Sequence, residues 1–106
     1  MIILDKEFTG TGAMKGVKFK QVMKNDRAFL YQLSDRDEES GKTWTWYEVF
    51  KRKVSNESDG IIGGVKVHFN AREIYPKSNN FGVWAWSILD YERAIEKFNE
   101  LSGPPK

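Results

Sequence analysis

The sequence predicts an α+β fold, in which an antiparallel β-sheet of about five to six strands packs one face against a single C-terminal helix. Three observations support this prediction. Segments of alternating apolar and polar residues fill most of the chain, one segment near its end has helical spacing, and no segment remains for the crossover helices that parallel strands require. A chain of 106 residues fits one domain, 1–106.

The C-terminal helix is the clearest element, and we predict it over 91–101. Asp90 is a good N-cap, because its carboxylate can accept hydrogen bonds from the first helical N–H groups. Gly103 suits a helix end and the two prolines after it prevent continuation, so 102–106 is expected to be a flexible tail. One face gathers the apolar residues that should pack on the sheet: Tyr91, Ala94, Ile95, Phe98 and Leu101.

The strands are predicted from alternation and from turn residues. A turn begins at Asn25, and a two-residue loop there would place apolar side chains opposite polar ones. We therefore expect a three-residue loop, which pairs Phe19 with Leu33. The same register pairs Met23 with Phe29. The predicted strands are 17–23, 29–33, 43–54, 65–69, 72–75 and 81–89, and the predicted loops between them include 35–42 and 55–64.

Composition excludes several classes of site. The chain has no cysteine, so disulfides, zinc–thiolate sites and thiol nucleophiles are excluded. Because small secreted domains usually depend on disulfides, a cytoplasmic location is expected. Charged residues follow the apolar start at once, and no apolar run approaches the ~20 residues of a membrane span, so no signal peptide and no membrane partner are expected. The net charge of +2 favours no particular partner.

Candidate catalytic residues are few, and we expect no enzyme activity, no cofactor and no metal. His68 is the only histidine, and a lone histidine on a strand cannot build a triad or a metal cluster. The acidic stretch 35–41 resembles a calcium loop superficially, but its glycine falls one place late and Trp46 stands where a bidentate Glu is needed. Glu48 shares strand parity with Trp46 and Phe50, which a bulge, a buried partner or a functional carboxylate would each explain.

Two tryptophan pairs are the most distinctive feature: Trp44 with Trp46, and Trp84 with Trp86. Because residues two apart on a strand share a face, each pair should present two indoles side by side. Large aromatics usually belong to the core of a small domain, but an exposed pair could stack on nucleic-acid bases at about 1–3 kcal/mol per base. We expect one pair to be partly exposed, because a helix on one face leaves the other face of the sheet open.

Basic residues lie close to these aromatics in the sequence. They are Lys18 and Lys20, and the run Lys51, Arg52 and Lys53. Cations beside flat rings suit the phosphates and bases of a single strand of nucleic acid. The alternative is a solvated lysine-rich face that protects a sheet edge from aggregation.

The order of these elements resembles a family of single-stranded nucleic-acid-binding proteins. The strand 44–53, the strand 81–89 and the helix 91–101 are similar to the pattern of the Whirly, Pur-alpha and transcriptional positive cofactor four family. The resemblance implies homodimers that bind nucleic acid across a curved sheet face. The chain departs from this pattern in its long loop 55–64 and in an extra short strand.

The sequence therefore predicts a non-enzymatic protein that binds single-stranded DNA or RNA. Trp44, Trp46, Trp84 or Trp86 would stack on bases, and Lys18, Lys20, Lys51, Arg52 and Lys53 would contact phosphates. The alternative is a protein-interaction module, such as an accessory or inhibitor protein of a phage or mobile element, whose exposed aromatics form the centre of a protein interface. An exposed tryptophan pair among basic residues would favour nucleic acid, and one beside acidic residues would favour a protein partner.

Overall fold

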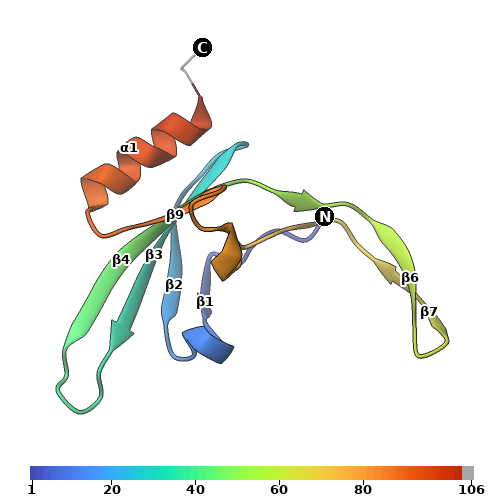
Figure 1. Ribbon diagram of the computed structural model, residues 1–106, viewed down its shortest axis with the longest axis horizontal. Coiled ribbons are helices and arrows are strands. Elements are labelled where there is room, and N and C mark those ends of the chain that lie inside the picture. Colours follow the sequence, from blue (N-terminus) through green and yellow to red (C-terminus); the bar gives the residue numbers. More distant parts are fainter. Residues whose placement is uncertain (104–106) are drawn as a thin grey trace.

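A computed structural model describes residues 1–103 and confirms the α+β fold. Five antiparallel strands form the main sheet in the order β1-β2-β3-β4-β9, and the helix α1 lies across one face of it (Figure 1). Two short 3-10 helices, η1 and η2, lie in the connections. The bounds are β1 Glu7–Thr9, η1 Gly12–Met14, β2 Lys18–Lys24, β3 Ala28–Arg36, β4 Thr43–Lys51, η2 Ser78–Asn80, β9 Ala85–Ile88 and α1 Tyr91–Ser102.

The helix α1 forms as predicted and is one residue longer than expected. The N–H of Glu92 donates to the Asp90 carboxylate at 3.0 Å, which confirms the N-cap. The apolar stripe of the helix covers one face of the sheet, where Phe98 packs with Leu30 and Val49. We call this side the helix face. Of the predicted tail, 104–106 lies outside the described residues.

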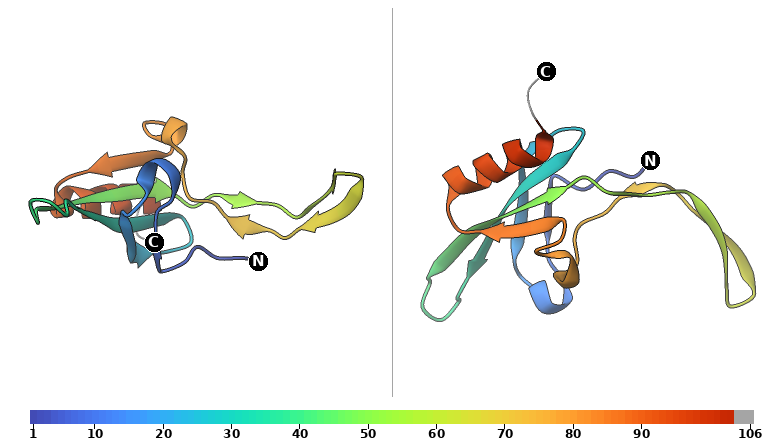
Figure 2. Two further views of the ribbon diagram at one scale, coloured as in Figure 1. Left: turned by 90° about the horizontal axis from the view of Figure 1, so that it is seen from below. Right: turned by 45° about the horizontal axis from the view of Figure 1, so that its top comes forward.

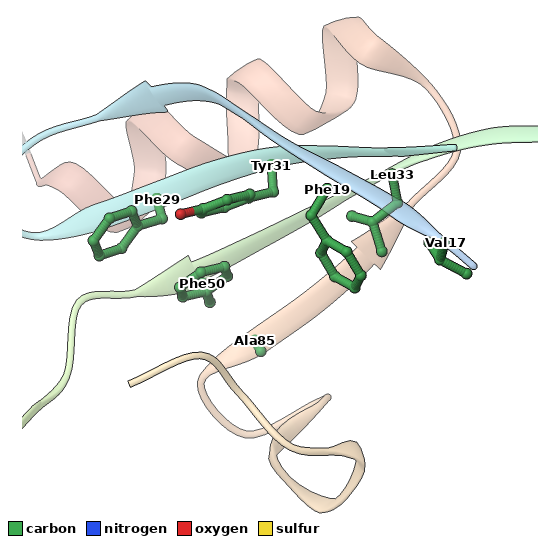
Figure 3. Packing of buried hydrophobic residues seen from close by; sticks show 7 residues of the cluster. All are labelled: Val17, Phe19, Phe29, Tyr31, Leu33, Phe50 and Ala85. Atoms are coloured by element: carbon green, nitrogen blue, oxygen red, sulfur yellow. The ribbon is translucent and has the colours of Figure 1, made fainter. Parts of the chain in front are cut away.

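The opposite face of the sheet is also covered, so the expectation of an open face was wrong. Side chains of β2, β3, β4 and β9 form an aromatic cluster there (Figure 3), and we call this side the aromatic face. Tyr75 lies on top of it, with its ring centroid 5.2 Å from that of Tyr31 and 4.8 Å from that of Phe50. Tyr75 belongs to the segment between β8 and η2, so the second cover is an irregular segment rather than a helix.

The register between β2 and β3 agrees with the prediction at one end and departs from it at the other. Phe19 pairs with Leu33, as expected, although beside the turn Lys24 rather than Met23 pairs with Phe29. Met23, however, pairs with Leu30 rather than with Phe29, because a β-bulge lies within β2. The extra residue reverses the parity of the strand, and Met23 thereby packs under the helix.

The predicted loop 55–64 contains a strand. β6 (Ser58–Ile62) pairs with β7 (Val65–Phe69) in a hairpin that we call the arm, and the arm extends away from the sheet (Figures 1 and 2). At its base, β5 (Val54–Ser55) pairs with β8 (Arg72–Glu73). The radius of gyration is 16.1 Å, whereas a compact chain of this length has about 13 Å. The arm accounts for this extended shape.

A buried carboxylate fixes the base of the arm to the body. Glu73 accepts hydrogen bonds from Arg52 Nε at 2.6 Å and from the backbone N–H of Leu4 at 3.0 Å, and Lys24 Nζ lies 3.5 Å away. Burial opposes ionisation of this carboxyl, but these donors and cations outweigh it and lower its pKa. The carboxylate therefore stabilises the fold at neutral pH, and this contribution is lost as the pH falls through the lowered pKa.

Truncation of the helix stripe should destabilise the whole domain. Phe98 is 4% exposed, so Phe98→Ala should lower the free energy of unfolding by about 3–5 kcal/mol through lost burial and a cavity. Urea denaturation followed by circular dichroism measures this change. Glu96→Ala, on the exposed side of the same helix, is the matched control and should change it by less than about 0.5 kcal/mol. Equal stabilities for the two variants would show that the helix is not docked.

Candidate functional site

The first half of β4 has a free edge. β3 pairs with the whole of β4, but β9 pairs with it only from Tyr47 to Phe50. Residues 43–46 therefore have a neighbouring strand on one side only, among the residues that the structure describes. Figure 1 shows this end of the β3–β4 hairpin extending beyond β9.

The backbone groups at this edge are set by the alternation of an antiparallel strand. The N–H of Lys51 donates to the carbonyl of Trp84 at 2.9 Å, so the odd-numbered residues of β4 direct their N–H and C=O groups towards β9. By the same alternation, Thr43 and Thr45 direct theirs towards the free edge. Two donors and two acceptors are thus aligned there, with the spacing of an added strand.

Trp44 and Trp46 stand beside this edge on the aromatic face. Trp44 is 51% exposed, whereas Trp46 packs partly against the aromatic cluster. This confirms the expectation that one pair is accessible. Asp35 is the cross-strand partner of Trp44, so it lies on the same face. A shallow groove of about 490 Å³ is lined by Asp35, Trp44, Thr45, Trp46, Ser87 and Leu89.

Glu48 lies on the same face of β4 as Trp46, and its carboxyl group has a buried hydrogen-bond partner in Tyr75. The hydroxyl of Tyr75 donates to Glu48 Oε1 at 2.7 Å, and the side chain of Trp46 also forms a hydrogen bond with Glu48. Burial raises the pKa of Glu48, and these two hydrogen bonds reduce the rise without cancelling it. Burial and the neighbouring Glu48 also raise the pKa of Tyr75. Of the three explanations for Glu48, the structure shows a buried partner.

The predicted phosphate contacts lie mostly away from these indoles. Lys18 and Lys20 flank Phe19 in β2 and point to the helix face, the side opposite Trp44. Lys51 pairs with Ala28 and is on the helix face as well. Arg52 is already engaged by Glu73. The structure therefore does not bring these four cations to the exposed tryptophan pair.

The second tryptophan pair is divided between the two faces, so the expectation of adjacent indoles was wrong there. Trp84 precedes β9 and packs on Phe50 of the aromatic face, with ring centroids 6.3 Å apart. Trp86 lies on the helix face, where Lys97 Nζ is 4.1 Å from its ring centroid. The alternation rule failed because β9 begins only at Ala85. Of the predicted basic residues, Lys53 does lie near an indole, with its Nζ 5.9 Å from the ring centroid of Trp84.

Two contributors to these sites were missed by sequence reasoning. Asp35 could have been found, since continuing the β3–β4 register places it opposite Trp44. Lys97 could not, because its contact with Trp86 depends on how the helix docks. His68 lies in the arm with Nδ1 2.7 Å from Asp59, well away from the β4 edge.

Comparisons with known proteins found no matching protein-family model, no matching curated protein and no matching solved structure. Within residues 1–103, no group of three or more His, Asp or Glu side chains could hold a metal ion. No helix in the described part of the chain is long and apolar enough to cross a membrane.

The raised pKa of Glu48 predicts a pH dependence of stability. A carboxyl whose pKa is higher in the folded state contributes stability below its unfolded pKa and loses it as the pH rises through the folded value. Glu48→Gln stays neutral, so the free energy of unfolding of this variant relative to the wild type should rise as the pH increases from the usual carboxyl pKa through the raised pKa of Glu48. Urea denaturation at several pH values measures this, with the exposed Glu38→Gln as control. A pH-independent difference would contradict the assignment.

Proposed function

We propose that the chain is a non-enzymatic protein-interaction module that binds an extended, basic segment of a partner protein along the free edge of β4. One observation carries the proposal. The backbone groups of Thr43 and Thr45 that face the free edge lie beside a half-exposed indole, Trp44, and a carboxylate, Asp35, of the same hairpin.

The backbone of the edge supplies the general affinity. An extended segment that adds to a sheet edge gains main-chain hydrogen bonds, and Thr43 and Thr45 each offer one N–H and one C=O. Proteins usually protect long exposed edges with lysine, proline or a covering loop. Here the neighbouring side chains include an exposed tryptophan instead, which favours contact with a partner.

The side chains at the edge select for positive charge. Alternate residues of an added strand would point to the aromatic face, where they meet Trp44 and Asp35. A cation over an exposed indole gains about 0.5–1 kcal/mol, and an exposed ion pair adds up to about 1 kcal/mol. A lysine or arginine at that position therefore binds best, because the ring and the carboxylate both attract it.

Binding of single-stranded nucleic acid remains the competing prediction. Trp44 and Trp46 share a face of the sheet, as that prediction requires, but Lys18 and Lys20 lie on the other face. The charged group that does line the groove is Asp35, which repels phosphate. The placement of charge therefore supports a basic peptide over a nucleic acid.

A peptide titration tests the proposal. The probe is a short capped peptide of alternating lysine and valine, and the matched probe replaces each lysine by glutamate. We expect the lysine peptide to bind about tenfold or more tightly and to shift the NMR signals of the Trp44 indole and the Thr45 amide. Stronger binding of an unstructured oligonucleotide at the same residues would favour nucleic acid instead.

Variants of the edge locate the contact. Trp44→Ala should weaken binding of the lysine peptide about two- to fivefold, as expected for one exposed cation–π contact. Asp35→Asn should weaken it to a similar extent and less so at high salt. Lys18→Ala, on the helix face, is the matched control and should leave the affinity unchanged. If Trp44→Ala and Lys18→Ala behave alike, the β4 edge is not the binding site.

A further inference from the structure

The last two residues of β3 carry opposite charges to the two faces of the sheet. Asp35 and Arg36 are consecutive in this strand, so their side chains point to opposite sides. Asp35 pairs with Trp44 on the aromatic face, whereas Arg36 pairs with Thr43, whose side chain is on the helix face. The free edge of β4 therefore has a carboxylate near one of its sides and a guanidinium near the other.

The helix-face side of this edge is open and positively charged. A hollow of about 740 Å³ lies there, and the cations that line it are Lys15, Lys18 and Arg36. Two acidic residues also line it, but the side chain of Asp35 belongs to the other face, so Glu38 is the acidic group on this side. Within residues 1–103, neither Lys18 nor Arg36 forms an ion pair. The charges of this hollow therefore favour an acidic ligand group.

A strand added to the edge would bring half of its side chains towards this hollow. Residues that lie directly opposite each other in a sheet share a face, so those beside Thr43 and Thr45 would point to the helix face. Arg36 lies one strand beyond Thr43, at two strand spacings, or about 10 Å, from the added backbone. Thr43 lies between them and has a short side chain. A long arginine side chain and an acidic side chain can therefore meet above it.

We propose that the β4 edge selects a partner strand of alternating charge, with basic side chains towards Trp44 and Asp35 and acidic side chains towards Arg36. This inference rests on the proposed function. It keeps the basic residues of that proposal on the aromatic face and assigns the residues that point to the helix face, which that proposal leaves open. Arg36 is then the residue that determines specificity for the acidic positions, and Lys18 strengthens the positive potential around it.

The same arrangement of charge fixes the register of the partner. A slip by one residue moves every side chain of a strand to the other face. For a strand of alternating charge, the slip would place a basic side chain beside Arg36 and an acidic one beside Asp35. Both contacts are repulsive, so only one of the two placements is favourable.

Two capped peptides of identical composition test the proposal. In Thr-Thr-Lys-Glu-Lys-Glu-Thr-Thr, lysines and glutamates point to opposite faces of an extended strand, whereas in Lys-Thr-Glu-Thr-Lys-Thr-Glu-Thr all four point to one face. Because the two peptides have equal net charge, non-specific attraction to the protein is the same for both. NMR titration of the Thr45 amide gives both dissociation constants. We expect the wild type to bind the first peptide about two- to fivefold more tightly, as one exposed ion pair provides.

Two variants assign this preference to its residue. Arg36→Gln should bind the two peptides equally, because the guanidinium that attracts the glutamates is absent. Lys66→Gln, at an exposed position of β7 in the arm, removes the same charge elsewhere and is the matched control. It should retain the preference of the wild type. High salt should reduce the preference in both the wild type and the control, since exposed ion pairs are screened.

The outcomes separate this inference from the proposed function. Equal binding of the two peptides by the wild type, or a preference that survives in Arg36→Gln, would overturn the alternating charge pattern. Binding of the lysine–valine peptide at Trp44 would support the proposed function in either case. If none of the three peptides shifts the signal of the Thr45 amide, both the proposed function and this inference are overturned.

Discussion

Burial of the central strand β3 on both of its faces is the constraint on which the rest of the structure depends. Leu30 and Tyr31 are neighbours on this strand, point to opposite faces and are both fully buried. The helix covers one face, but the other needs Tyr75, which the chain reaches only after forming the arm. Glu73 fixes the arm base beside the sheet and so positions Tyr75. The end of β4 near Trp44 is left half exposed, and the candidate site lies there.

Local patterns predicted the parts of the fold that depend on local chemistry. The helix follows from its N-cap and its apolar spacing, and it ends at Gly103, whose φ is positive. Phe19 does pair with Leu33, but Lys24 pairs with Phe29 beside the turn, so the β-bulge and not the turn alone produces this register. The bulge in β2 was not predictable, because it turns Met23 towards the helix α1, which is distant in sequence. β6 was missed because its glycine and polar residues have little strand propensity, and its order comes from pairing with β7.

The sequence predicted the aromatic residues of the candidate site, but it did not predict which charged residues lie beside them. Strand parity placed Trp44 and Trp46 together and identified Glu48 as anomalous, and both features persist in the structure. Alternation within one strand does not show which faces of two different strands lie on the same side of the sheet. The sequence therefore predicted that Lys18 and Trp44 contact the same nucleic acid, although Lys18 lies on the helix face. The cross-strand register places Asp35 beside Trp44, which the sequence of one strand alone does not show. This carboxylate repels phosphate and attracts a cation, so it changes the favoured partner.

The central claim, that the first half of β4 is an open edge to which a strand can add, is tested most directly by amide hydrogen exchange. Thr45 and Val49 lie on the same strand and direct their N–H groups to the same side, but only Val49 has β9 as a neighbour there. The account predicts that the Thr45 amide exchanges much faster than that of Val49 and slows when the lysine–valine peptide is added. A Thr45 amide already as protected as that of Val49, or one that the peptide leaves unchanged, would contradict it.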